Sequence, residues 1–230
     1  MSKEEQKMKR TKLAARMLPD YTRGEERFNM ISHIVGGGLG IAATVLCVIT
    51  AALRGNVYGV VSGAIFGASM VALYTISSVY HGLRCEMGKK VMQVLDHCTI
   101  YFLIAGTYTP FCLCTIRQHN SALGWGTFGL IWALAAVGIV LNAIDLKRFQ
   151  KASMVLYLGM GWCIILTGKL IVTLLGTAGF ALLLWGGVAY TVGAVFYTLG
   201  HKRRYIHSVF HLFCLVGSAL HALCILFYVI

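Results

Sequence analysis

The segment VYGVVSGAIFGASMVALYTISSVYHGL (residues 57–83) decides the fold class, because it contains no Lys, Arg, Asp or Glu along its whole length. A helix needs about 20 predominantly apolar residues to cross the hydrocarbon core of a bilayer. Other parts of the chain share this character, and short connections separate them. The predicted spans are 28–53, 57–83, 96–116, 122–144, 152–175, 178–200 and 205–230.

The overall composition supports a membrane location. Of the 230 residues, 58% are hydrophobic and 12% are charged, whereas a soluble domain has about 25% charged residues to keep its surface in water. This excludes a soluble globular protein and a disordered chain. The apolar runs do not alternate as β-barrel strands do. We therefore predict an all-α, polytopic protein with a basic cytoplasmic tail (1–27) and a domain of seven transmembrane helices (28–230).

The basic residues predict the orientation of this domain. Of the 20 Lys and Arg residues, eight lie in 1–27 and three each in 84–95, 145–151 and 201–204. All of these lie on one side of the membrane if the spans alternate. Because basic loops stay cytoplasmic, we expect the N-terminus inside and the C-terminus outside, in the inner (plasma) membrane. The net charge of +12 then reflects topology and contact with anionic lipid headgroups, and not nucleic-acid binding.

Arg54 and Arg117 fall on the opposite side, and Lys169 near the outer end of the fifth span is expected to extend its ammonium group outward.

The eight cysteines form no Cys-x-x-Cys pair. Since they lie mostly within apolar runs, we expect buried thiols without disulfides.

Glycines at intervals of four predict close helix packing. Gly59, Gly63 and Gly67 share one face of the second span, and Gly36 and Gly40 share a face of the first. Such small-residue faces let helix backbones approach each other in lipid.

Four predicted spans bring polar side chains to one depth, just inside the cytoplasmic boundary. These are Asn29, Ser32 and His33 in the first span, Ser77 and His81 in the second, Asp96 and His97 in the third, and His207 and His211 in the seventh. Ionisable groups at membrane depth are costly and usually functional.

The spacing of some of these residues suits a metal ion. His207 and His211 are four residues apart and therefore share a helix face. With His81 and Asp96 they supply three imidazoles and one carboxylate, a set suited to Zn²⁺. His221 lies about 15 Å further along the same helix and cannot bind the same ion.

Structural alternatives stand beside this interpretation. Asp96 could cap the N-terminus of its helix, and the His207–His211 pair could serve as a proton relay. His33, His97 and His221, taken singly, are more typical of histidines that bond a neighbouring helix.

Four motifs together resemble the hemolysin-III family of membrane proteins, which is related to the progestin and adipoQ receptors and more distantly to alkaline ceramidases. They are EERFNMISH (25–33), SSVYHGL (77–83), LDHCTIYFLIAGTYTPF (95–111) and HSVFHLFCLVGSALH (207–221). The resemblance implies a seven-helix fold with Zn²⁺ near the cytoplasmic side. It implies metal ligands at His81, Asp96, His207 and His211, with Ser77 close to the metal or its water.

The leading hypothesis for function is hydrolysis of a lipid amide or ester at the cytoplasmic leaflet, with Ser77 and Asp96 as catalytic residues. Ser77 would orient water or donate to the developing oxyanion, and Asp96 would act as general base. Three alternatives remain open: a non-enzymatic sensor or regulator of membrane lipid with a structural zinc, a pore-forming cytolysin, and a zinc or proton carrier.

Overall fold

The computed structural model describes residues 11–200 and 203–230, and within these ranges every regular element is helical. Residues 1–10 of the predicted tail and Lys202 of the predicted basic turn lie outside the described residues. The long helices are α2 (Arg23–Leu53), α3 (Val57–Gly82), α4 (Glu86–Pro110), α6 (Ser121–Asp145), α7 (Gln150–Trp162), α8 (Gly168–Leu199) and α9 (Ile206–Cys224). The shorter ones are η1 (Leu13–Ala15), η2 (Phe111–Ile116), α5 (Arg117–His119), η3 (Cys163–Thr167) and η4 (Ile225–Val229).

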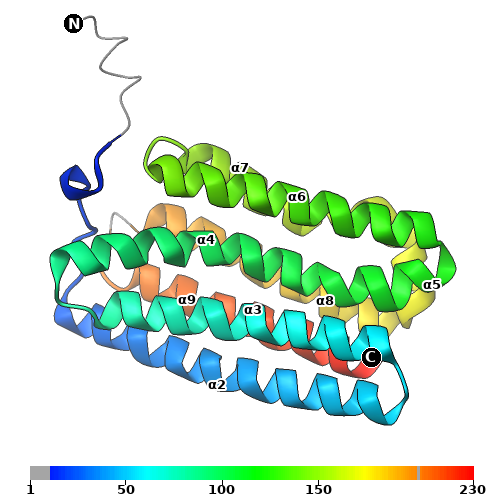
Figure 1. Cartoon of the computed structure of the whole chain (residues 1–230). Helices are drawn as coiled ribbons and strands as arrows, with labels where there is room; N and C mark the ends of the chain where they lie inside the picture. The colour runs from blue at the N-terminus through cyan, green and yellow to red at the C-terminus, as the bar shows by residue number, and fades with distance from the viewer. Residues whose placement is uncertain (1–10, 201–202) are drawn as a thin grey trace, which may run out of the picture.

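Six helical stretches of the described chain are long and apolar enough to cross a membrane. One of them, Gln150–Leu199, has 50 residues, about 75 Å if it were one straight helix. It is not straight, because Gly176 interrupts α8 with φ 67° and ψ 176°. These are angles that a residue with a Cβ rarely adopts. The chain runs along α7 towards one end of the molecule and returns along α8 (Figure 1).

Two helices begin earlier than the membrane spans that were predicted within them. The first helix begins at Arg23 and not at residue 28, because Thr22 caps its N-terminus: the Thr22 hydroxyl accepts from the Glu25 N–H, and Glu25 accepts from the Thr22 N–H. The third begins at Glu86 and not at residue 96. Asp96 therefore lies in the interior of α4, which excludes the prediction that it caps the helix.

The connections gather at two opposite ends of the bundle. The α3–α4 and α6–α7 connections, the last turn of α8 and the first turn of α9 lie at the end reached by the N-terminal segment. The α2–α3 and α5–α6 connections lie at the other end with the C-terminus (Figure 1). The described parts of the predicted basic segments therefore share one end of the molecule.

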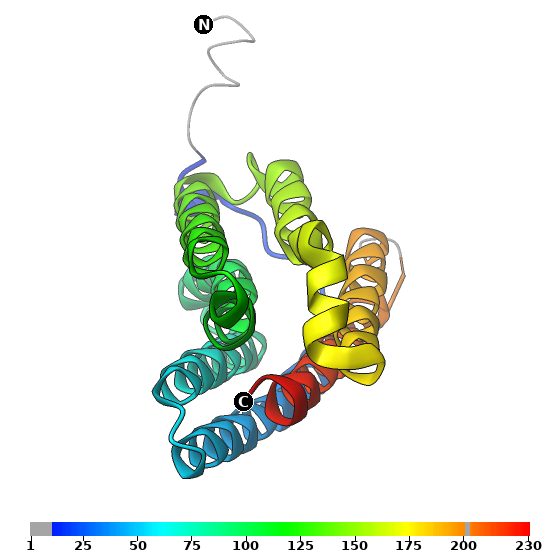
Figure 2. The ribbon, with the colours of Figure 1, turned by 90° about the vertical axis from the view of Figure 1, so that its right-hand side faces the viewer.

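The helices α2 and α3 pack against each other along the glycine faces, as predicted. A Cβ on Gly63 would lie 3.0 Å from the Cys47 Cβ, and one on Gly40 would lie 3.1 Å from the Val71 backbone nitrogen. Both distances are shorter than an ordinary van der Waals contact of a Cβ. The glycines therefore let the two helix backbones lie closer together than larger residues would. Viewed along the bundle, α2 and α3 form one edge of a ring of helices (Figure 2).

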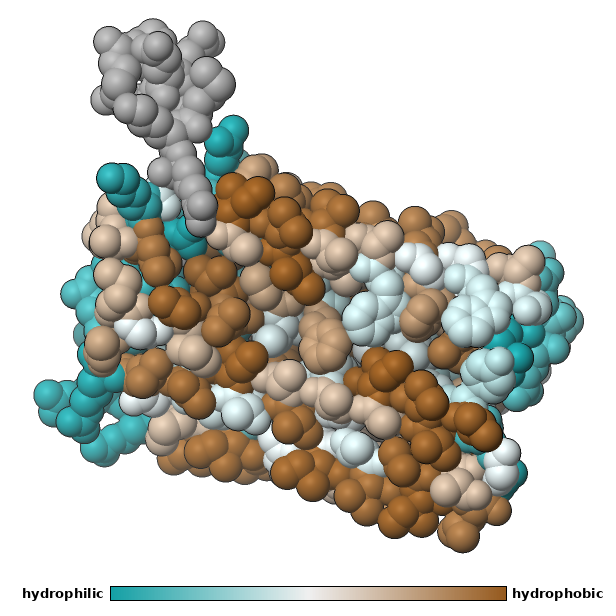
Figure 3. Space-filling view, viewed as in Figure 1, coloured by the Kyte–Doolittle hydropathy of each residue, from teal (hydrophilic) through white to brown (hydrophobic). Residues whose placement is uncertain are grey.

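The outer surface matches a lipid environment. Hydrophilic residues gather at the two ends of the visible face, and a broad hydrophobic belt lies between them (Figure 3). Exposed side chains such as Ile31, Ile34 and Val35 on α2 contribute to the apolar exterior. Polar side chains are instead buried between the helices, and this inversion is expected where the solvent is lipid.

Candidate metal centre

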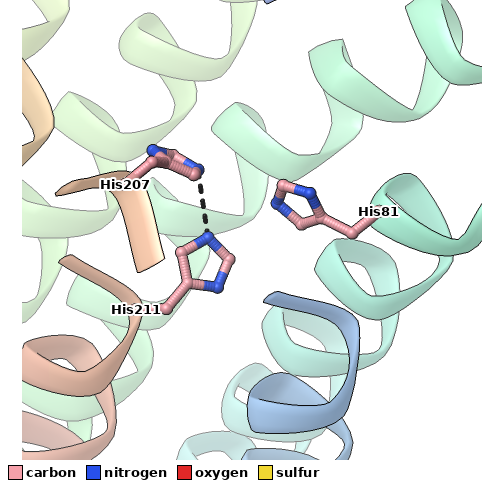
Figure 4. Close-up of side chains that lie close together, drawn as sticks. All are labelled: His81, His207 and His211. Carbon is pink, nitrogen blue, oxygen red and sulfur yellow. Dashed lines mark hydrogen bonds between the residues drawn. The ribbon is translucent and has the colours of Figure 1, made fainter. Parts of the chain in front are cut away.

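Three histidines from two helices meet inside one end of the bundle. His81 lies in the last turn of α3, and His207 and His211 lie in the first turns of α9. One ring nitrogen of each lies within 4.8 Å of those of the other two. Figure 4 shows the His81 ring directed towards the other two, with His207 Nε2 and His211 Nε2 in contact at 3.1 Å. The i, i+4 spacing on α9 thus places two ligands together, and the packing of α3 supplies the third.

A carboxylate on α2 orients His81. His81 Nδ1 donates to Glu26 Oε2 across 2.6 Å, and Lys89 donates to the other oxygen of the same carboxylate. Because a carboxylate only accepts, the bond places the proton on Nδ1 and leaves the Nε2 lone pair free to coordinate. Metal-bound histidines usually have such a partner on the second ring nitrogen.

The donor set fits a metal ion. His81 Nε2 is buried without a hydrogen-bond partner within the described part of the chain. A buried polar atom left unpaired costs about 1–3 kcal/mol, so a ring nitrogen in this state needs an explanation. Three imidazoles converging from two helices are ligands of the type and number found in zinc sites with an open position.

An N-terminal segment covers the site from the end of the bundle. This segment, residues 11–22, is called the strap. It is held by three contacts: the Thr11 N–H donates to Asp145, Arg16 donates to the Ile144 carbonyl, and Lys90 donates to the Ala14 carbonyl. These bonds fix the strap across α6 and α4 before it enters α2.

The last part of the strap places an aromatic ring on the histidines. The Tyr21 ring stacks on His207 with centroids 4.9 Å apart and lies 5.8 Å from His81. Burial, and then the nearby Tyr197, Glu26 and Asp96, raise the pKa of Tyr21, so its hydroxyl stays protonated at neutral pH. The strap therefore closes the site with a neutral, partly apolar group.

An apolar cavity of about 390 Å³ adjoins the histidines. Its lining comes from α2, α3, α4, α7, α8 and α9, with His33, Ser77, Asp96 and His211 among the polar members. Most of the rest is aliphatic or aromatic, including Leu73, Phe111, Trp162 and Phe180. An elongated lipid chain suits such a cavity better than a polar metabolite does.

The structure places the two predicted catalytic residues beside this cavity. Ser77 lies one turn before His81 on α3 and is buried. Asp96 lines the same cavity from α4, but it is not a member of the group in which the three histidine nitrogens lie within 4.8 Å of one another. Its Oδ2 lies 3.8 Å from His97 Nδ1.

The remaining histidines differ in their surroundings. His97 Nε2 contacts the Tyr197 hydroxyl of α8 at 3.0 Å, and His221 Nε2 contacts the Leu183 carbonyl of the same helix at 3.1 Å. Both therefore bond a neighbouring helix, as the structural alternative predicted. His33 does not: its ring stacks on His211 with centroids 3.8 Å apart, and neither of its ring nitrogens has a partner among the described residues.

Sequence reasoning did not anticipate two features of this site. The sequence did not predict the hydrogen bond between His81 and Glu26, although Glu26 belongs to the motif EERFNMISH (25–33). Its signal was the spacing of Glu26, Asn29 and His33, which places all three on one face of the first helix. The cover by Tyr21 had no sequence signal, because its position depends on where the strap crosses the bundle.

Comparison with known proteins agrees with this geometry. A family model described as "Haemolysin-III related" matches residues 21–222. The chain belongs to this family. It is 43% identical over 206 residues to Hemolysin-3 of Bacillus cereus, covering 90% of this chain and 92% of that protein. It is also 41% identical over 208 residues to the Hemolysin-3 homolog of Bacillus subtilis (strain 168), covering 90% of this chain and 96% of that protein.

A more distant similarity extends to animal proteins of the same general type. The human monocyte to macrophage differentiation factor is 28% identical over 166 residues, which cover 68% of this chain and 66% of that protein. No solved structure gives a significant match. The resemblance to the hemolysin-III family expected from the four motifs is thereby confirmed. The match covers the three histidines, Glu26, Ser77 and Asp96.

Proposed function

We propose that this membrane protein of the hemolysin-III family is a zinc-dependent hydrolase that cleaves a lipid amide or ester at the cytoplasmic leaflet. The observation that carries the proposal is the position of the histidine group. One member of the group, His211, lines a largely apolar cavity that Ser77 and Asp96 also line. A lipid would place its chain in the cavity and its amide or ester beside the histidines.

The proposal includes seven membrane crossings, with the N-terminus and the histidine group on the cytoplasmic side in the inner (plasma) membrane. Two observations support it. The turn at Gly176 divides the 50-residue stretch into two segments, each long enough for one crossing. The described parts of the basic segments share one end of the bundle, as the preference of Lys and Arg for the cytoplasm requires.

Each residue of the site has a role in this proposal. His81, His207 and His211 would hold Zn²⁺, which supplies Lewis-acid chemistry and makes water nucleophilic at neutral pH when it is bound in an open site. The Ser77 hydroxyl orients the attacking water or donates to the oxyanion that develops on the carbonyl. Asp96 accepts a proton as general base, a role open to it because it is not in the three-histidine group.

Metal analysis tests the first half of the proposal. The protein is purified in detergent without chelator, and zinc is measured by mass spectrometry. We expect close to one zinc per chain in the native protein and almost none after His207→Ala with His211→Ala. A metal-free native protein would contradict the assignment.

Lipid analysis tests the second half. The native protein, with and without chelator, is incubated with total membrane lipid, and the products are resolved by mass. We expect a free fatty acid to accumulate only without chelator. Ser77→Ala is expected to keep zinc and lose this turnover. Turnover that persists in the double His→Ala variant would show that catalysis belongs elsewhere.

The same experiment separates the two main alternatives. A protein that holds zinc but cleaves no lipid supports a non-enzymatic sensor or regulator with a structural metal. The cytolysin alternative follows from the name of the Bacillus relatives. It predicts dye release from liposomes by the purified protein, whereas the hydrolase predicts intact liposomes.

A further inference from the structure

One histidine that lines the cavity, ten residues beyond His211 on α9, has a ring nitrogen without a hydrogen-bond partner among the described residues. His221 of α9 is buried and lines the same cavity as His211 and Ser77. Its Nε2 lies 3.1 Å from the Leu183 carbonyl oxygen. Because a carbonyl only accepts, the proton is on Nε2, and Nδ1 carries a lone pair. No hydrogen-bond partner for Nδ1 lies among the described residues.

The surroundings of His221 fix the ring without offering a donor. Gly186 of α8 makes room for the imidazole, since a Cβ at this position would collide with it. Tyr190 packs against the ring with centroids 5.5 Å apart, but its hydroxyl is engaged with Ser218 at 2.6 Å. Ser218 in turn receives a bond from Tyr74. None of these hydroxyls is hydrogen-bonded to His221 Nδ1.

We propose that His221 Nδ1 is a subsite for a hydroxyl group carried on the chain of a lipid bound in the cavity. The ten residues from His211 to His221 correspond to about 15 Å along the helix, so the hydroxyl belongs to the middle of a long acyl chain and not to the polar group beside the histidines. A neutral hydroxyl satisfies the lone pair without the large cost of burying a charge in an apolar cavity. The ligand class is a hydroxylated long-chain lipid. This inference rests on the proposed function, because it takes the cavity as the lipid site.

Binding of two matched fatty acids tests the subsite. Full-length protein in detergent is equilibrated with radiolabelled stearic acid or with stearic acid that carries a mid-chain hydroxyl. We expect the native protein to bind the hydroxylated acid about tenfold more tightly, as one buried hydrogen bond allows. His221→Phe keeps a planar ring but removes the acceptor. It is expected to bind the two acids with equal affinity.

Two controls keep the result interpretable. Leu223→Ala changes an exposed side chain of α9 outside the cavity lining and is expected to keep the preference. Stearic acid with the hydroxyl next to the carboxylate is expected to bind the native protein no more tightly than stearic acid does. This comparison uses only the native protein, so it does not depend on whether a variant folds. Equal affinity for the two acids in the native protein, or a preference that survives His221→Phe, would overturn the subsite.

The outcomes also separate this inference from the hydrolase proposal. If neither acid binds the native protein, the cavity is not a lipid site and both fail. If the native protein prefers the mid-chain hydroxyl but cleaves no lipid, the subsite is supported and only the hydrolase proposal is contradicted.

Discussion

At the scale of single residues, the site depends on how one histidine is oriented. Glu26 accepts the His81 Nδ1 proton across 2.6 Å while its other oxygen accepts from Lys89. The His81 side chain itself is fully buried. The orientation of His81 is therefore set by a residue that does not itself reach the ligand group.

Glu26→Gln is expected to weaken zinc binding by about 10–100-fold, the usual effect of removing such a partner from a ligand histidine. The amide keeps the shape of the side chain but loses the charge that stabilises the proton on Nδ1. Competition titration with a zinc-chelating dye measures the change. Glu86→Gln is the matched control, because the Glu86 carboxylate pairs with Lys90 and is exposed. Unchanged affinity in Glu26→Gln would mean that His81 is not a ligand.

At the scale of elements, two arrangements define the site: the packing of α3 on α2, and the course of the strap. The first brings Glu26 and His81 together from different helices. It depends on glycines that hold the backbones close, such as Gly67 against Thr44. The second brings Tyr21 over the histidines from a segment tied to α4 and α6.

Gly67→Ala is expected to destabilise the protein by about 1–3 kcal/mol, the typical cost of overpacking. The new Cβ would lie 2.8 Å from the Thr44 Cα, so the backbones of α2 and α3 must separate. Thermal unfolding in detergent measures the loss as a lower Tm. Gly38→Ala on α2 is the control, since a Cβ there meets nothing within 4 Å. Because alanine favours a helix over glycine, the control should be as stable as the native protein or slightly more so.

Tyr21→Ala is expected to open the metal site without removing a ligand. The ring that stacks on His207 is lost, so chelator should strip zinc several-fold faster, while the zinc content of the untreated protein stays the same. Stopped-flow mixing with a chelating dye measures the rate. Met17→Ala changes a strap residue that is 88% exposed and should leave the rate unchanged. Equal rates for both variants would show that the strap does not limit access.

At the scale of the whole molecule, the two ends of the bundle differ in charge. The strap, the α3–α4 and α6–α7 connections, the last turn of α8 and the first turn of α9 share one end, and the connections near Arg54 and Arg117 lie at the other. This asymmetry predicts the orientation in the membrane. It also places the histidine group near the basic end, since His81 closes α3 and His207 opens α9.

Labelling of intact cells tests the orientation. Cys85 is exposed in the α3–α4 connection, and the other cysteines are buried or half-buried. A membrane-impermeant maleimide is expected to label Cys85 only after the cells are opened. The Ser121→Cys variant presents a thiol at the opposite end and should react in intact cells. The reverse pattern would mean that the N-terminus lies outside.

Much of the fold could be predicted because its signals are local. The apolar runs, the absence of charge in 57–83 and the glycine spacing of α2 and α3 all follow from periodicity and composition. The boundaries were less certain, since a helix can extend past its apolar part when its first turns lie at the interface. This is why α4 begins at Glu86 and Asp96 does not cap it.

The sequence by itself determined that the protein is an all-helical membrane protein of the hemolysin-III family and that His207 and His211 share a face, because both depend only on residue type and spacing along one chain segment. Only the tertiary structure decided which groups surround them. The Glu26–His81 bond, the stacking of His33 on His211, the cover by Tyr21 and the exclusion of Asp96 from the three-histidine group depend on how helices are rotated and offset against one another. That register comes from packing summed over whole interfaces, and no single segment of sequence encodes it.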